Sequence, residues 1–114
     1  MNAEEAGLRA AQLFKPEIMM LFIIHAVDRT DALPTRPEHY DAHKAFLSDT
    51  SHFGAKIVMS GPLVADDGKT MIGSLFVVEA PGRTEVEAFH KSDPFFAAGI
   101  WKTVTITGFL RRQG

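Results

Sequence analysis

The sequence contains no cysteine among its 114 residues. This absence excludes disulfide frameworks, thiolate zinc sites and a cysteine nucleophile, and it favours a cytoplasmic location. No apolar run approaches the ~20 residues of a membrane span, and the opening residues lack the basic and apolar regions of a signal peptide. We therefore expect a cytoplasmic protein that does not act at a membrane.

An excess of positive charge is also absent. Twelve basic and 14 acidic side chains leave a formal net charge of −2 when the five histidines are neutral. Nucleic-acid binders usually carry a strongly basic surface, so we do not expect a nucleic-acid partner. With 46% hydrophobic and 23% charged residues, the chain has the composition of one globular domain with one hydrophobic core.

The first residues are interpreted as an addition to this domain. Residues 1–15 have an amphipathic pattern that predicts a helix, and Pro16 ends it. We therefore divide the chain into a helical extension over residues 1–18 and a domain over residues 19–114. The apolar side of the extension would require a surface to cover, on its own domain or on a partner subunit.

The first half of the domain is predicted to contain a strand and a helix. Residues 20–27, MLFIIHAV, form an apolar, branched run that is typical of a strand buried on both faces. Thr35 and Glu38 have the spacing of a capping box at the start of a helix. We expect that helix to continue to about Phe53 and to end at Gly54, which tolerates a left-handed conformation.

The second half is predicted to begin with a hairpin. Two strand-like runs within residues 55–80 flank Asp67 and Gly68, a pair typical of tight hairpin turns. Pro62 indicates a bulge or a sheet edge in the first run. The remaining elements are a helix over residues 84–91 that begins with a second capping box, a helical turn over residues 95–100 and a strand over residues 101–110.

This order, strand, helix, strand, strand, helix, strand, predicts the α+β ferredoxin-like βαββαβ fold. Such a fold has a four-stranded antiparallel sheet with its helices on one face, and the other face requires a cover. Because the first and third strands are apolar on both faces, we expect a second copy of the chain to cover it. The sequence thus predicts a homodimer.

Motifs spread over residues 20–110 support this fold by resemblance. In chain order they are the strand MLFIIHAVD, Arg36-Pro37-Glu38-His39, Ser60-Gly61-Pro62, Gly73-Ser74, Asp93-Pro94-Phe95, Ala97-Ala98-Gly99 and Gly108-Phe109. In this combination the chain resembles the YciI-like (YCII-related) family of the dimeric α+β barrel group. The resemblance implies a ferredoxin-like dimer with facing sheets and a proposed active-site pair, which by motif is His39 and Asp93. One chemistry that it implies is dehydrochlorination of a chlorinated aromatic diol.

The predicted pair suits proton transfer. His39 lies in the second turn of its predicted helix, where the helix dipole disfavours imidazolium and favours the neutral form that a general base requires. Asp93 would fix the tautomer of the ring and stabilise its protonated form. The alternative is structural, since a histidine on a buried stripe often belongs to the core and an aspartate before proline often caps a turn.

Other side chains are candidates for substrate binding. Arg36 would clamp a carboxylate or phenolate at the mouth of the site, with a solvated arginine as the alternative. His25 would line the pocket from the first strand, at a position where many relatives carry tyrosine. The floor of the site would be formed by Ser60, Gly61 and Pro62, or these residues would simply form a bulge. His39 and His43 have the spacing of two metal ligands on one helix, but no metal signature surrounds them, and we expect no metal site.

These patterns lead to a ranked set of functional hypotheses. The first is a small dimeric enzyme that uses His39 and Asp93, with no organic cofactor, for an elimination, an isomerisation or a related proton transfer. Its substrate would be a small aromatic or carbonyl-bearing metabolite. The second is a non-catalytic dimer that binds a small ligand in the same pocket. The third is a structural assembly module, which requires no pocket.

Overall fold

A computed structural model describes residues 19–114, and the helix predicted over residues 1–15 lies outside the described residues. The described chain forms the strands β1 (Met20–Asp28), β2 (Lys56–Val64), β3 (Met71–Ala80) and β4 (Trp101–Phe109). Its helices are α2 (Thr35–Leu47), the 3₁₀ turn η1 (Ser51–Phe53), α3 (Arg83–Lys91) and α4 (Pro94–Ala97). No helix within residues 19–114 has the length and apolar character needed to cross a membrane.

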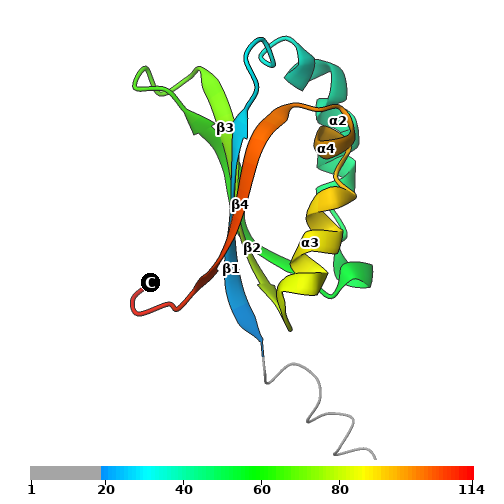
Figure 1. The fold of residues 1–114 in the computed structure, drawn as a ribbon, viewed down its shortest axis with the longest axis vertical. Coiled ribbons are helices and arrows are strands. Elements are labelled where there is room, and N and C mark those ends of the chain that lie inside the picture. Colours follow the sequence, from blue (N-terminus) through cyan, green and yellow to red (C-terminus); the bar gives the residue numbers. More distant parts are fainter. Residues whose placement is uncertain (1–18) are drawn as a thin grey trace, which may run out of the picture.

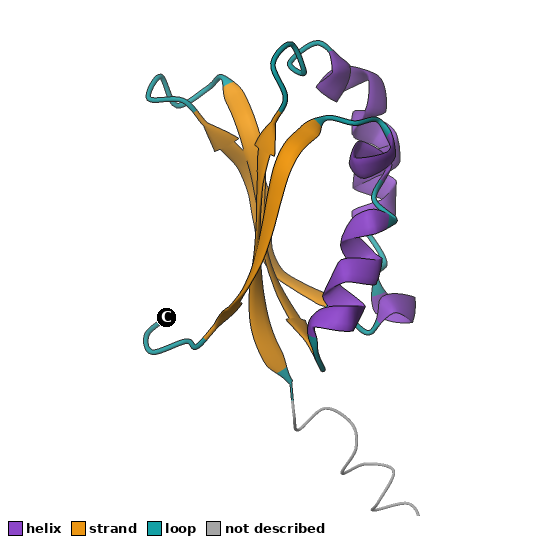
Figure 2. Cartoon of the chain, viewed as in Figure 1, coloured by secondary structure: helices purple, strands orange, loops and turns teal. Residues whose placement is uncertain are grey.

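The four strands form one antiparallel sheet in the order β2-β3-β1-β4. Within residues 19–114, all helices lie on one face of this sheet and none covers the opposite, open face (Figures 1 and 2). The predicted α+β, ferredoxin-like βαββαβ arrangement is therefore confirmed. The helical turn predicted after Asp93 corresponds to α4.

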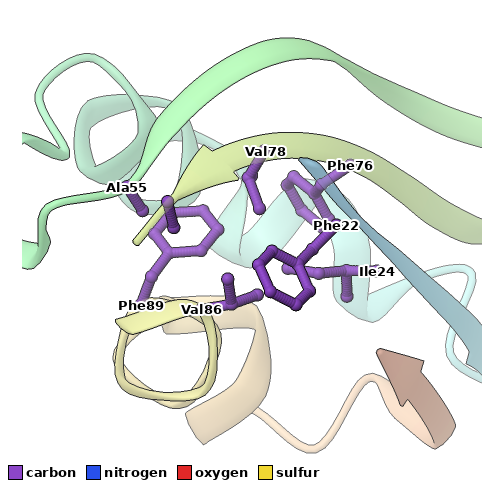
Figure 3. Close-up of a cluster of buried hydrophobic side chains, with 8 residues drawn as sticks. Phe22, Ile24, Ala55, Phe76, Val78, Val86 and Phe89 are labelled. Atoms are coloured by element: carbon purple, nitrogen blue, oxygen red, sulfur yellow. The ribbon is translucent and has the colours of Figure 1, made fainter. Parts of the chain in front are cut away.

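The core lies between the sheet and the helices. Side chains of β1 alternate, so Phe22, Ile24 and Ala26 are buried toward the helices while the residues between them point to the open face. Figure 3 shows Val86 and Phe89 of α3 packed against this side of the sheet. The main cluster consists of Phe22, Ile24, Ala55, Phe76, Val78, Ala80, Val86 and Phe89.

Neither predicted capping box is present. Pro34 precedes α2 in a helical conformation, with φ −70° and ψ −21°, and no side chain caps the helix. Because the chain is already helical there, Thr35 falls in the first turn, and its hydroxyl accepts a hydrogen bond from Arg29 instead. Gly82 precedes α3, also without a side-chain cap. Both boxes were therefore wrong, although the helix starts lie within one residue of the predicted ones.

The first helix is shorter than predicted. It ends at Leu47, and the predicted last turn is separated from it as η1. Short polar side chains explain the break: Ser48 Oγ donates to the Ala45 carbonyl, and Asp49 accepts from both the amide and the hydroxyl of Ser51. Gly54 ends η1 with φ +72°, so the predicted left-handed position is correct.

The hairpin is confirmed, with a longer loop than a two-residue turn. Asp67 accepts from the amides of Lys69 and Thr70, and Gly68 has φ +73°. Pro62 lies in β2, an edge strand, as predicted. The ladder irregularities flank Pro62 at residues 57–59 and 63–64 and do not include it, since it pairs regularly with Ser74.

Candidate functional site

A cavity of about 830 Å³ lies between α2 and the β2–β3 side of the sheet. Helix α2 lines it with residues spaced three to four apart, as expected for one helix face. The helical lining is Arg36, Pro37, Tyr40, His43, Lys44 and Leu47, and the strands contribute Ser60, Gly61, Pro62, Met71, Ser74 and Phe76. Leu33, Lys69, Thr70 and Phe95 complete the wall. The predicted residues Ser60, Gly61 and Pro62 thus belong to it.

The wall contains a histidine–carboxylate pair. Nδ1 of His43 lies 2.7 Å from Oδ1 of Asp93, and both side chains are buried. The same Oδ1 accepts a hydrogen bond from the Phe95 amide at 2.9 Å. Because this oxygen already acts as an acceptor, we assign the proton between His43 and Asp93 to Nδ1 of His43. The Phe95 ring stacks on the imidazole at 3.9 Å between centroids, with 3° between planes. The orientation of His43 is thus fixed by one hydrogen bond and one stacking contact, which leaves Nε2 as the free ring nitrogen.

This geometry corrects the predicted partner of Asp93, which is His43 and not His39. The buried face of α2 passes through Arg36 and His43, seven residues apart and almost two full turns. His39 is turned roughly 60° away from Arg36 at about 100° per residue, is only half-buried and does not line the cavity. The seven-residue spacing of Arg36 and His43 was the sequence signal that could have identified the correct histidine.

His25 is also misplaced by the prediction. It lies in β1 between Ile24 and Ala26, which face the helices, so its own side chain points to the open face of the sheet and is exposed. The cavity lies on the other face, and His25 does not line it. Within residues 19–114, no three His, Asp or Glu side chains are grouped as metal ligands.

Arg36 lines the cavity and is buried, so the alternative of a solvated arginine is wrong. Its Nε and Nη2 donate hydrogen bonds to the two carboxylate oxygens of Asp28 at 2.7 and 2.8 Å. Nη2 also donates to the Gly73 carbonyl and to Ser74 Oγ. Nη1 has only the Met71 sulfur, at 3.9 Å. Since sulfur is a weak acceptor, Nη1 retains the capacity to donate to a ligand oxygen.

Comparison with known proteins agrees with this architecture. Residues 20–110 match the YCII-related domain. The chain belongs to the YCII-related family. Protein YciI of Escherichia coli O6:H1 and of Shigella flexneri are each 30% identical to it over 97 residues, which cover 81% of this chain and 98% of each relative. The predicted family is therefore confirmed.

A solved structure is also similar to this YCII-related chain. It is a 5-chloro-2-hydroxyhydroquinone dehydrochlorinase from Burkholderia phenoliruptrix AC1100, in complex with 2,5-dihydroxybenzoquinone. The two chains are 33% identical with a TM-score of 0.68, and the match covers 83% of this chain and 96% of the dehydrochlorinase. That relative is an enzyme that acts on a small aromatic molecule.

The cavity of this YCII-related protein carries a charge bias. Of the residues that the structure describes, Lys44 and Lys69 line the cavity, and no aspartate or glutamate does. The charge of Arg36 is balanced by Asp28, so the two lysines are the cationic groups of the lining that remain. Most of the wall is apolar, with Phe76 and Phe95 on it. Such a lining favours a flat apolar ligand that carries oxygen substituents or negative charge.

Sequence reasoning missed His90, a residue of α3. The residue is 3% exposed, and its ring stacks on Trp101 at 4.9 Å between centroids. Burial lowers the pKa of His90 below its ordinary value, while the Asp93 carboxylate opposes this shift and Lys91 adds to it. The sequence signal was its position four residues after Val86, on the buried face of α3.

Proposed function

We propose that this YCII-related protein is a small-molecule enzyme in which His43, oriented by Asp93, transfers a proton on a small aromatic or carbonyl-bearing substrate. The observation that carries the proposal is the 2.7 Å contact between the two side chains at the wall of a cavity of about 830 Å³. His43 takes the role that the sequence assigned to His39. Asp93 keeps its predicted role.

In this mechanism the carboxylate fixes the tautomer of the ring. Because Nδ1 carries the proton that Asp93 binds, Nε2 has the lone pair that accepts a proton from the substrate. Asp93 then stabilises the imidazolium that forms, without itself becoming protonated. The proton later returns from Nε2 to the product or to water, so His43 acts as both base and acid.

Arg36 supplies the second element of the mechanism. Negative charge develops on a carbonyl or phenolic oxygen when a neighbouring proton is removed, and a donor already in place there lowers the barrier. Nη1 of Arg36 is a donor on the cavity wall that has no oxygen partner among the described residues. Its guanidinium is held in place by Asp28, Gly73 and Ser74, so little reorganisation is required.

The reaction class we propose is elimination, for which the related dehydrochlorinase provides the first test substrate. In a chlorinated hydroxyhydroquinone, the proton of one hydroxyl moves to the ring carbon that bears chlorine, and the C–Cl bond then breaks as a second hydroxyl proton is removed. The products are a quinone and HCl. The atoms and electrons balance without an oxidant or an organic cofactor. This class therefore suits a site that consists of a histidine, a carboxylate and an arginine.

We also propose that the protein acts as a homodimer whose subunits meet through the open face of the sheet. This face carries Ile23 of β1 and Leu75 of β3, together with Met59 of β2, which is 60% exposed. A second copy would remove this apolar surface from water. Sedimentation velocity of the wild type and of an Ile23→Lys variant tests the proposal, with a dimer and a monomer expected respectively.

The decisive experiment for the activity measures chloride release and quinone absorbance with 5-chloro-2-hydroxyhydroquinone and related chlorinated diols. We expect His43→Asn to reduce kcat by about 100-fold or more, the usual contribution of a general base. The matched control is His39→Asn, on the same helix one turn earlier, which should leave kcat within about twofold. Equal losses in the two variants would contradict the assignment of His43.

The second candidate is a ligand-binding protein without turnover, which requires the same cavity. The cavity itself is the observation that favours both candidates over a purely structural module. Calorimetric titration with the same diols separates the two. A wild type that binds them and releases no chloride or other product would support the binding protein.

A further inference from the structure

Three buried polar atoms remain unpaired beside the His43–Asp93 pair. They are both ring nitrogens of His90 and Oδ2 of Asp93, and among residues 19–114 no other buried side-chain nitrogen or oxygen lacks a hydrogen-bond partner. His90 is 3% exposed and Asp93 is 1% exposed, so bulk water does not reach them. Buried polar groups almost always have partners, and an isolated set of three requires an explanation.

His90 and Asp93 are three residues apart at the end of α3. His90 lies in the last turn of α3, and the Asp93 amide donates to the His90 carbonyl at 3.2 Å. Oδ1 of Asp93 is already engaged by His43 at 2.7 Å and by the Phe95 amide at 2.9 Å. Oδ2 is therefore the oxygen of Asp93 that is left for a further partner, and no direct hydrogen bond joins it to His90.

We propose that His90 is a positioning residue, linked to Oδ2 of Asp93 by an internal water molecule. One ring N–H of neutral His90 donates to the water, and the water donates to Oδ2. An internal water is stable when it has two or more polar partners, and His90 and Asp93 provide them. Asp93 is then held from both oxygens, by His43 on one side and by His90 through water on the other.

This link stabilises the orientation on which the proposed function depends. A carboxylate with one oxygen unpaired can rotate and exchange its oxygens, which weakens its hold on Nδ1 of His43. A partner on Oδ2 prevents this rotation, as outer partners do for catalytic groups in general. The consequence for catalysis rests on the proposed function, whereas the water link itself does not.

The competing explanation is that His90 is only an aromatic filler. Its ring stacks on Trp101 and meets Phe96 edge-on at 5.5 Å between centroids. A phenylalanine would make both contacts equally well, but it has no nitrogen to bind water. The substitution His90→Phe therefore separates packing from hydrogen bonding.

The first test does not depend on activity. Proton NMR of the ligand-free protein should show a downfield resonance for Nδ1–H of His43, assigned by its loss in His43→Asn. We expect His90→Phe to broaden or shift this resonance and His90→Gln, which retains a donor and an acceptor, to restore it. The matched control is His52→Phe, at an exposed histidine whose ring lies 4.0 Å from the Phe53 ring between centroids, and it should leave the resonance unchanged.

The second test measures kinetics and the water directly. Because His90 does not line the cavity, His90→Phe should lower kcat by about 10-fold with KM within about twofold, in the range usual for outer partners. A high-resolution crystal structure of the wild type should show density for a water at Oδ2 of Asp93. An unchanged His43 resonance in folded His90→Phe, or no water at Oδ2, would overturn the proposal. If no substrate turns over, the proposed function fails while the resonance and the water still decide this inference.

Discussion

The ion pair between Asp28 and Arg36 provides a quantitative test of how the site is built. The pair joins the end of β1 to the first turn of α2, and both side chains are only 7% exposed. The carboxylate binds Nε at 2.7 Å and Nη2 at 2.8 Å, a bidentate contact. Substitution Asp28→Asn removes the negative charge and one of the two acceptors, and it leaves the guanidinium buried without its counter-charge.

The expected cost follows from these contacts. Removing one partner of a buried ion pair typically costs about 3–5 kcal/mol of stability. The side-chain amide of asparagine still has one oxygen that can accept a hydrogen bond from Arg36, so we expect Asp28→Asn to cost about 3 kcal/mol, near the lower end of this range. For a domain of this size each kcal/mol lowers the melting temperature by about 4–8 °C. We therefore expect a decrease of roughly 12–24 °C in a protein that still folds at 25 °C.

Circular dichroism during heating and urea titration measures this loss. The matched control is Asp66→Asn, in the exposed loop after β2, which should change the free energy of unfolding by less than about 0.5 kcal/mol. The double variant Asp28→Leu with Arg36→Met should recover much of the loss, since an apolar pair can replace a buried ion pair. A loss below about 1 kcal/mol for Asp28→Asn would refute the burial argument and would indicate that Arg36 is a solvated arginine.

Three further predictions follow from other parts of the structure. A Cβ atom at Gly73 would lie 2.4 Å from a backbone carbonyl of β1, so Gly73→Ala should lower the melting temperature strongly. The control is Gly108→Ala, which should lower the melting temperature little, because the space around a Cβ atom at Gly108 is open. Burial lowers the pKa of His90 in the folded protein, so the His90 imidazole binds a proton more readily in the unfolded chain. The contribution of neutral His90 to the free energy of unfolding is therefore complete above about pH 6.5 and decreases at lower pH. Urea titrations from pH 7 to 5 should show this decrease in the wild type, and a smaller one in His90→Phe. Substitution Lys69→Met should weaken the binding of anionic 4-hydroxybenzoate in calorimetry and leave the binding of neutral 4-hydroxybenzamide unchanged. The control Lys102→Met, at an exposed position outside the cavity, should affect the binding of neither ligand. Equal effects of Lys69→Met on the two ligands would contradict the charge argument.

The order of elements was predictable because its signals are local. The apolar run of β1, the Asp67-Gly68 turn and the break before Pro94 act through neighbouring residues, and each lies where the sequence indicated. The capping boxes were equally local in pattern but failed. Their hydroxyls require an extended residue at the helix start, and the chain from Ala32 to Thr35 already turns with helical hydrogen bonds.

The site itself depended on contacts that no short pattern encodes. Asp93 lies 50 residues from His43, and Arg36 reaches the Gly73 carbonyl across 37 residues. The sequence predicted the correct carboxylate and the correct helix but the wrong histidine on that helix, because His39 and His43 both lie near its buried face. The packing of α2 against α4 selects His43, which lies on the same helix face as Arg36, and the same packing places His43 on Phe95.

Asp93 connects the local pattern to the distant contact. Pro94 forces the residue before it out of the helical region, and Asp93 accordingly has ψ 131° and caps α4 through the Phe95 amide. The oxygen that accepts this amide is the same one that binds His43. A structural cap therefore also orients the proposed base, and contacts among the consecutive residues Asp93, Pro94 and Phe95 set the position of the carboxylate. The histidine is then the member of the pair that depends on the tertiary fold, so variants that loosen α2, such as Asp28→Asn, should disturb the pair from the side of His43.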